Sequence, residues 1–327
     1  MAARHAALGL NDVTGLQGNR LAIYTGGMEK ITQAMESQTV YDHPIDSRRR
    51  FLRRMSRLAI GAAGVLGAST AYAYWEASRI CIRPKTIALP RLPRAFEGKT
   101  VAILTDFHHG PNVGLGFIRK AARMASSLKP DIIVLLGDFA NKSIHTSEQL
   151  PPCMEVVAGL EAPLGVYAIP GNHDMQDAGA VYTQTIRTTP LTDLTNRSVR
   201  LSVAGEHLHL AGVDEMWWGK PDQQAALKDC PDGAAVILLS HNPDFAEENP
   251  NPRVDLVLSG HTHGGQICLP LVGPLWLPSR YGLKYRAGLV QGPASQVFIS
   301  CGIGVAGVPL RFNCPPEINL LTLTRAE

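Results

Sequence analysis

Residues 100–108 have the sequence Thr-Val-Ala-Ile-Leu-Thr-Asp-Phe-His, and this stretch decides the fold. Its apolar run is typical of a short buried strand, and the strand ends at Asp106. Four further apolar runs end in the same way, each at a side chain that can bind a metal ion: Asp138, Asn172, His241 and His261. Ligands of open α/β sheets gather beyond the carboxyl ends of the strands. The sequence therefore predicts an α/β fold with one polar site where five strands end.

The rest of the chain supplies further helices and strands. The spacing of apolar residues predicts a helix over 117–128 and another over 146–160, and Pro151-Pro152 is expected to mark the start of the second. Residues 82–96, in which proline and arginine cluster, are expected to form an extended linker or an edge segment. Alternating or apolar runs predict a hairpin and two more strands, at 199–203 with 207–212, 297–300 and 318–323.

Composition and charge exclude several classes of protein. The 327 residues are 45% hydrophobic and 18% charged, which excludes a disordered, collagen-like or coiled-coil chain and a membrane protein with many spans. Residues 1–57 hold nine Lys and Arg against five Asp and Glu, whereas the chain from Tyr74 onward holds 22 against 23. The main domain is therefore not basic, and nucleic acid is not expected as a partner. The six cysteines contain no CxxC pair, and the spacing leaves disulfides and buried thiols both open.

A leader-like segment precedes the main domain. Ser47-Arg48-Arg49-Arg50-Phe51-Leu52-Arg53 is followed by an uncharged stretch, residues 58–74, in which Ala71-Tyr72-Ala73 has the small residues of a cleavage site. This order is similar to the bacterial twin-arginine signal, which implies export by the twin-arginine translocation machinery to the periplasm or cell envelope. The alternative is an uncut anchor on the outer face of the cytoplasmic membrane, because about 17 apolar residues lie at the lower limit for spanning a bilayer.

These observations predict four parts of the chain. Residues 1–46 are an N-terminal extension that is expected to be disordered, and residues 47–74 are the signal or anchor. Residues 75–99 are expected to be a linker, and residues 100–327 the catalytic domain.

The polar residues at the strand ends suit a metal site. Asp106 and His108 are two positions apart, as are His261 and His263, and each pair is expected to lie on one side of an extended segment. Carboxylate oxygen and imidazole nitrogen suit Mn²⁺, Zn²⁺ or Fe²⁺ better than Ca²⁺. Two Asp, one Asn and four His exceed the needs of a single tetrahedral zinc. They suit two divalent ions that share a bridging carboxylate and hold a hydroxide for attack on phosphorus.

Two neighbouring residues are candidates for acid–base chemistry. His173 adjoins the candidate ligand Asn172 and is expected to act as general acid towards the leaving oxygen. Asp174 follows His173 and is expected to fix the tautomer of its ring, as carboxylates commonly do.

The ordered blocks resemble the calcineurin-like metallophosphoesterases. The resemblance rests on Asp106-Phe107-His108, Gly137-Asp138, Gly171-Asn172-His173-Asp174, His241 and Gly260-His261-Thr262-His263. Residues 278–282 and 302–312 are further similar to the YkuE-like bacterial branch, which commonly carries a twin-arginine leader. The resemblance implies a sandwich of two mixed β-sheets flanked by helices. It also implies that His173 is the proton donor, that Asp138 bridges two ions, and that the ions are held by Asp106, His108 and His263 and by Asn172, His241 and His261.

The resemblance and the leader together imply a substrate class. We expect a phosphoesterase that hydrolyses a phosphorylated membrane lipid or cell-envelope compound, with a diester or pyrophosphate favoured over a monoester. His109, Arg280 and Arg311 are candidate substrate contacts, and surface ion pairing is the alternative for the two arginines. One competing function is hydrolysis of the pyrophosphate in a UDP-linked lipid A precursor, against which an export signal argues. Another is a non-catalytic metal-binding scaffold, against which the complete ligand set argues.

Overall fold

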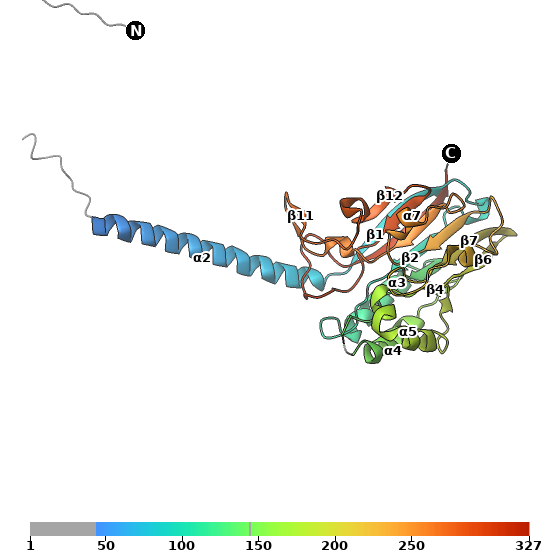
Figure 1. Ribbon diagram of the computed structural model, residues 1–327, viewed down its shortest axis with the longest axis horizontal. Helices are drawn as coiled ribbons and strands as arrows, with labels where there is room; N and C mark the ends of the chain where they lie inside the picture. The colour runs from blue at the N-terminus through green and yellow to red at the C-terminus, as the bar shows by residue number, and fades with distance from the viewer. Residues whose placement is uncertain (1–43, 144, 327) are drawn as a thin grey trace, which may run out of the picture. The chain divides into compact units, whose positions relative to one another are not determined.

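The computed structural model describes residues 44–143 and 145–326, which are coloured in Figure 1. The chain divides into two units, Met1–Ala63 and Gly64–Glu327. In the first unit, residues 44–63 form the beginning of helix α2 (Pro44–Ala77), and the expected disorder of residues 1–46 falls almost wholly outside the described residues. Among the described residues, no helix combines the length and the hydropathy that crossing a lipid bilayer requires.

Two six-stranded sheets form the centre of the second unit. The first sheet has the order β1-β14-β2-β3-β4-β5 and is parallel except between β14 and β2. Its strands are Cys81–Leu89 (β1), Glu317–Arg325 (β14), Thr100–Leu104 (β2), Ile132–Leu135 (β3), Val166–Ala168 (β4) and Thr192–Asp193 (β5). The second sheet has the order β12-β13-β9-β8-β7-β6 and is antiparallel only at its two ends. Its strands are Gly288–Gln291 (β12), Gln296–Ile299 (β13), Leu256–Ser259 (β9), Val236–Leu239 (β8), Glu206–Gly212 (β7) and Arg197–Val203 (β6).

Apolar side chains join the two sheets face to face and attach helices to their outer faces. Ile103 and Val134 of the first sheet and Ile237 of the second belong to one buried cluster between the sheets. The outer face of the first sheet packs on α3 (Leu115–Ser127), α4 (Thr146–Ala158) and α5 (Asn172–Ile186), which lie together in Figure 1. The outer face of the second packs on the short helices α6 (Gln223–Ala226) and α7 (Phe245–Glu248). The expected sandwich of two mixed sheets flanked by helices is confirmed.

The start of this domain differs from the sequence-based expectation. Residues 81–89 form the edge strand β1, which pairs in parallel with β14 from Cys81 opposite Glu317 to Leu89 opposite Arg325. The prediction of a linker over 75–99 is therefore wrong for this segment, and the edge alternative holds. In the sequence, Pro84 argues against a strand because proline lacks the N–H that a strand donates. An edge strand leaves one side unpaired and therefore tolerates a proline.

Helix α4 also differs at its start. The helix begins at Thr146, so Pro151 and Pro152 lie inside it and the expectation that they mark its start is wrong. The two missing N–H groups leave the carbonyls of Ser147 and Glu148 without helical partners. Both residues are exposed, so water can satisfy these carbonyls.

The last turns of α2 belong to the second unit and bond to it. The carbonyl of Ala73, in the expected cleavage site, accepts a hydrogen bond from the Arg311 backbone N–H at 3.0 Å. The buried carboxylate of Glu76 accepts the backbone N–H groups of Asn313 at 3.1 Å and Cys314 at 2.7 Å. This segment therefore caps a loop that precedes β14.

Replacing Glu76 by alanine tests this cap. Glu76→Ala leaves two backbone donors without their acceptor, and we expect the free energy of unfolding to fall by about 1–3 kcal/mol. Urea denaturation of the full chain measures the loss. The exposed helical residue Glu155 gives a control, since Glu155→Ala should change the free energy by less than about 0.5 kcal/mol. Equal effects of the two substitutions would contradict the capping role.

Candidate metal centre

Left-handed backbone conformations aim the candidate ligands. The φ angles of five candidate ligands lie between 50° and 69°, a region that residues other than glycine rarely occupy. These ligands are Asp106, His108, Asp138, His261 and His263. The expectation that each pair lies along an extended segment is therefore wrong. Each strand ends in a tight turn instead, and the turn directs the side chains of both members of a pair into the site. Such strained residues cluster at functional sites.

Two glycines let the ends of β3 and β4 approach each other. Gly137 has a φ of 85°, and a Cβ there would collide with the backbone of Gly171. A Cβ on Gly171 would in turn collide with the Asp138 carboxylate. Both positions therefore need glycine so that Asp138 can lie against the start of α5.

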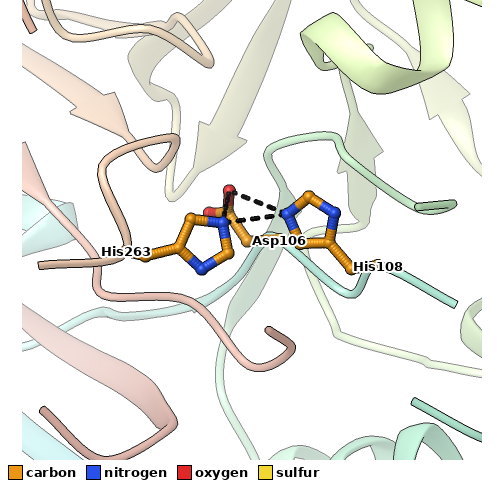
Figure 2. A group of neighbouring side chains, drawn as sticks. All are labelled: Asp106, His108 and His263. Atoms are coloured by element: carbon orange, nitrogen blue, oxygen red, sulfur yellow. Dashed lines mark hydrogen bonds and ion pairs between the residues drawn. The ribbon is translucent and has the colours of Figure 1, made fainter. Parts of the chain in front are cut away.

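Asp106, His108 and His263 form the first group of ligand atoms, and Figure 2 shows their side chains facing one another. The Nε2 atoms of the two imidazoles lie 2.9 Å apart. The Asp106 carboxylate lies 3.3 Å from Nε2 of His263 and 3.8 Å from Nε2 of His108. Three ligand atoms, from the loop after β2 and from the loop after β9, thus lie close enough to share one ion.

Asp138 lies between this group and a second one. Its Oδ2 is 3.5 Å from Nε2 of His108 and 3.4 Å from Nε2 of His241. On the far side, Nε2 of His241 is 3.1 Å from Oδ1 of Asn172. Asp138 thus occupies the position that a bridging ligand needs, within reach of one histidine from each group.

His261 completes the second group. Its ring lies 5.1 Å from that of His241, and the Trp217 ring packs against it in a T-shaped arrangement at 4.5 Å between ring centroids. Its buried Nε2 has no hydrogen-bond partner, which is costly for a polar atom unless a ligand binds there. All seven predicted ligands therefore converge on one buried site.

The donor set fits divalent ions. Asp106 and Asp138 bring two carboxylates into a site that is at most 2% exposed at either residue, and such charge needs compensation. Nδ1 of His241 donates to the carbonyl of Leu136, which leaves Nε2 free to bind a metal. Of the seven residues, His241, His261 and Asn172 would hold one ion, Asp106, His108 and His263 the other, and Asp138 both.

The charges and the burial of the site give its histidines different pKa values. Burial alone would raise the pKa of Asp106 and Asp138, but the neighbouring histidines lower both. Burial alone would lower the pKa of His241, yet the carboxylates of Asp138 and Asp106 raise it to about 10. Burial and then the charge of His241 lower the pKa of His261 to about 3. At neutral pH, His261 is therefore ready to bind a metal, whereas His241 must first lose a proton.

His173 borders the site with a defined tautomer. Its Nδ1 accepts the backbone N–H of Lys142 at 2.8 Å, so the proton of the neutral ring sits on Nε2. Its own backbone N–H donates to Asp138 at 2.8 Å, and its ring lies 4.7 Å from that of His108. Burial lowers the pKa of His173 to about 4, so the ring is neutral at pH 7 and can donate a hydrogen bond from Nε2.

Asp174 does not fix this tautomer, and that prediction is wrong. Its carboxylate accepts the backbone N–H groups of Phe139 at 2.9 Å, Ala140 at 3.3 Å and Gly171 at 2.9 Å. Burial, together with the charge of Asp138, raises its pKa to about 7. The role of Asp174 is to hold the turn after β3 against the start of α5, and the backbone of Lys142 sets the tautomer instead.

The three candidate substrate contacts have other partners in the structure. Nδ1 of His109 donates to the carbonyl of Gln149 at 2.7 Å, and Arg280 forms an exposed ion pair with Glu248 at 2.8 Å. Arg311 is fully buried, so its prediction as a substrate contact is wrong. Its guanidinium donates to the carbonyls of Gly304 and Cys301 and lies 3.3 Å from Nδ1 of His263, behind the ligand loop.

Glu215, which is not among the residues predicted from the sequence, supports the second group. Its buried carboxylate accepts the backbone N–H groups of Trp217 and Trp218, each at 2.7 Å. These bonds hold the turn that sets the Trp217 ring against His261. An acidic residue before two tryptophans carries no distinctive spacing, so only the structure shows this contact.

The raised pKa of His241 predicts a pH dependence of metal affinity. Metal binding at Nε2 must displace a proton that is bound below about pH 10, so affinity should rise about tenfold per pH unit between pH 6 and 9. Competition with a chromophoric chelator for Mn²⁺ or Zn²⁺ measures this slope. His241→Asn should bind the second ion more weakly and lose most of the pH dependence. An affinity independent of pH in the unsubstituted chain would contradict the assignment.

Comparisons with known proteins identify related chains. The family model described as calcineurin-like phosphoesterase matches residues 99–265. The chain is 34% identical over 280 residues to the uncharacterized metallophosphoesterase YkuE of Bacillus subtilis, covering 85% of this chain and 97% of the relative. It is 29% identical over 289 residues to the phosphodiesterase YaeI of Escherichia coli, covering 85% and 99%. A dimetal phosphatase from Danio rerio superposes with a TM-score of 0.40 at 10% identity, covering 65% and 90%.

Proposed function

The chain belongs to the calcineurin-like phosphoesterase family, whose members bind a dinuclear centre of divalent ions, and we propose that this metal-dependent phosphohydrolase cleaves a phosphodiester of a membrane lipid or cell-envelope compound. Mn²⁺, Zn²⁺ or Fe²⁺ suits its nitrogen and oxygen ligands. The similarity to YaeI, which is named a phosphodiesterase, supports a diester over a monoester. The twin-arginine-like leader supports a substrate outside the cytoplasm.

One observation carries the catalytic part of this proposal. The Asp138 carboxylate lies within 3.5 Å of one histidine from each group of ligands, so two ions would share it. When bound, such ions neutralise charge on the phosphoryl oxygens and lower the pKa of the attacking water. A single structural zinc would need neither the shared carboxylate nor the surplus of ligands.

The chain's own residues prepare the rest of the reaction. His173 presents Nε2–H at the border of the site, where it donates a hydrogen bond to the phosphoryl or leaving oxygen. An anionic phosphate next to this ring raises its pKa from about 4, which strengthens it as a proton donor. Asp138 fixes the backbone of His173, and Asp174 fixes the turn beside it, so the acid is held before substrate arrives.

The leader is proposed to direct export of a chain that keeps its helix. Arg48 and Arg49 occupy the twin-arginine positions. A peptidase that cuts after Ala73 would have to unfold a buried residue whose carbonyl is hydrogen-bonded and would separate it from the cap formed by Glu76. We therefore propose that the chain stays uncut in the periplasm or cell envelope.

Replacing both arginines tests the route. In a bacterial host, Arg48→Lys with Arg49→Lys should leave the full-length chain in the cytoplasm, while the unsubstituted chain reaches the envelope. Cell fractionation and the intact mass of the exported protein are the measurements. Arg53→Lys with Arg54→Lys is the control, because it also replaces two arginines but leaves Arg48 and Arg49 in place. The control chain should reach the envelope. An envelope fraction that is unchanged by the first pair would contradict the twin-arginine route.

A pair of chromogenic substrates tests the activity. After metal stripping and re-addition of Mn²⁺, Zn²⁺ or Fe²⁺, we expect hydrolysis of bis-p-nitrophenyl phosphate to return and to exceed that of p-nitrophenyl phosphate. Asp138→Asn should lower kcat by about 1,000-fold or more and lose at least one ion per chain, because the shared charge disappears. Asp131→Asn is the control, because Asp131 precedes β3 whereas Asp138 follows it. Asp131 pairs with Lys99 at that opposite end of the strand. Near-normal activity of Asp138→Asn with both ions retained would overturn the bridging role.

The dependence on leaving group tests His173. His173→Ala should slow diesters with an alkyl leaving group at least tenfold more than those with p-nitrophenolate, because proton donation matters most for a poor leaving group. Equal losses for both kinds of substrate would count against proton donation and would leave His173 a role in binding only.

A further inference from the structure

An uncharged apolar hairpin stands beside the metal centre. Residues 267–278, Ile-Cys-Leu-Pro-Leu-Val-Gly-Pro-Leu-Trp-Leu-Pro, contain no charged side chain. They form β10 (Cys268–Leu269) and β11 (Gly273–Pro274), and the hairpin end labelled β11 projects from the domain in Figure 1. At its tip Leu271 is fully exposed, with a φ of 65°, and Trp276 is 69% exposed. Large apolar side chains gathered in this way mark a surface that contacts an apolar partner.

A second loop faces the hairpin and is fastened to it. Val308, which is 48% exposed, belongs to this loop. The side chain of Gln266 donates to the carbonyls of Ala306 and Val308, each at 3.1 Å, and accepts the backbone N–H of Ala306 at 2.9 Å. One amide thus ties both loops together through three hydrogen bonds, so the space between them exists before a ligand enters.

The space between the two loops is a pocket of about 430 Å³ that reaches the metal centre. Leu275, Trp276 and Val308 line its outer part, and His173 and His263 line its inner end. The volume is that of a site for a small molecule. A group bound here would extend from the phosphate at the metal centre towards the exposed hairpin.

The side chains that line the pocket determine which chemical group it can bind. The Gln266 amide is used by the loops, and the Thr262 hydroxyl donates to the carbonyl of Arg286 at 2.8 Å. Away from the two histidines, the described residues that line the pocket offer no free polar side chain for a sugar or a nucleobase, and they include no Asp, Glu, Lys or Arg. An alkyl chain would instead gain from burial against such a wall.

We propose that this pocket is a subsite for an acyl chain of the substrate, and that the hairpin tip enters the lipid bilayer from which that substrate comes. The proposal rests on the proposed phosphodiesterase function and names its substrate as a lipid with a phosphodiester headgroup. A bilayer fits the hairpin better than a protein partner does. A stable protein interface buries about 1,200–2,000 Å² over a broad patch, whereas this hairpin consists of two strands of two residues each. Tryptophan beside such a tip suits the boundary between headgroups and acyl chains.

A series of soluble diesters tests the subsite on the metal-loaded full chain. Methyl, butyl and octyl p-nitrophenyl phosphate are compared below their critical micelle concentrations. We expect kcat/KM for the octyl ester to exceed that for the methyl ester by at least about tenfold, since each buried methylene can contribute up to about fourfold. Trp276→Ala and Val308→Ser should each bring this ratio below about threefold.

Leu283→Ala provides the matched control for these substitutions. Leu283 is 67% exposed, almost as much as Trp276, but it does not line the pocket, so its loss should leave the ratio unchanged. Equal kcat/KM for all three esters, or a ratio that Trp276→Ala does not alter, would overturn the subsite. Failure to hydrolyse even the methyl ester with ions bound would contradict the proposed function instead.

Hydrogen exchange tests the bilayer contact without using activity. With vesicles of phosphatidylethanolamine and phosphatidylglycerol, the amides of residues 269–276 should exchange at least about fivefold more slowly than in buffer, and those of residues 282–285 should not change. Leu271→Asp should abolish this protection while leaving the octyl-to-methyl ratio intact. Unchanged exchange in residues 269–276 would overturn bilayer entry, and equal protection of both segments would indicate non-specific adsorption and overturn it as well.

Discussion

Two buried carboxylates at the ends of neighbouring strands are the constraint on which the site depends. Asp106 follows β2 and Asp138 follows β3, and both are almost inaccessible to water. Their charges must be compensated, and the surrounding structure does this with imidazoles and backbone N–H groups. The N–H of His261 reaches Asp106, and the N–H of His173 reaches Asp138. Divalent ions would supply the larger share of the compensation, which makes metal binding and folding of this region interdependent.

The site also depends on how the two sheets pack. Asp106, Asp138 and Asn172 follow strands of the first sheet, whereas His241 and His261 follow strands of the second. The apolar cluster between the sheets therefore sets the distance between the two halves of the ligand set. A substitution that creates a cavity in that cluster would shift the ligand residues relative to one another, because close-packed interiors transmit small displacements.

Sequence reasoning located the site because its signals are local. Each apolar run ends at a polar residue, and parallel strands bring such ends to one edge, so the ligand residues could be named before any geometry was known. The turns that aim them could not be anticipated, because the left-handed backbone of Asp106 is held by hydrogen bonds to Gly137 and Gly304, which are distant in the chain. The partner of Asp174 was misassigned for a similar reason. Adjacency in sequence favoured His173, whereas the fold presents backbone donors from the turn after β3.

Distant contacts also explain why the sequence does not reveal the role of Arg311 and leaves both a linker and an edge strand open for residues 81–89. An arginine near the end of the chain resembles a free cation in the sequence, and only the fold surrounds it with carbonyls. A strand that contains Pro84 and is followed by further prolines and arginines resembles a linker until β14 pairs with it. Long-range pairing of this kind leaves little periodicity in the segment itself.

The left-handed turns restrict how the ligand set could change. Aspartate and histidine are among the few residues besides glycine that accept this conformation readily. The residue types that bind the ions are thus also the ones that the backbone permits. Converting Asp106 or His261 into a bulkier or branched donor would impose a conformational penalty even if the new side chain bound metal well. Over evolutionary time, such coincidence of backbone tolerance and coordination chemistry leaves few neutral substitutions at these positions, and redesign for another metal would have to rebuild the turns first.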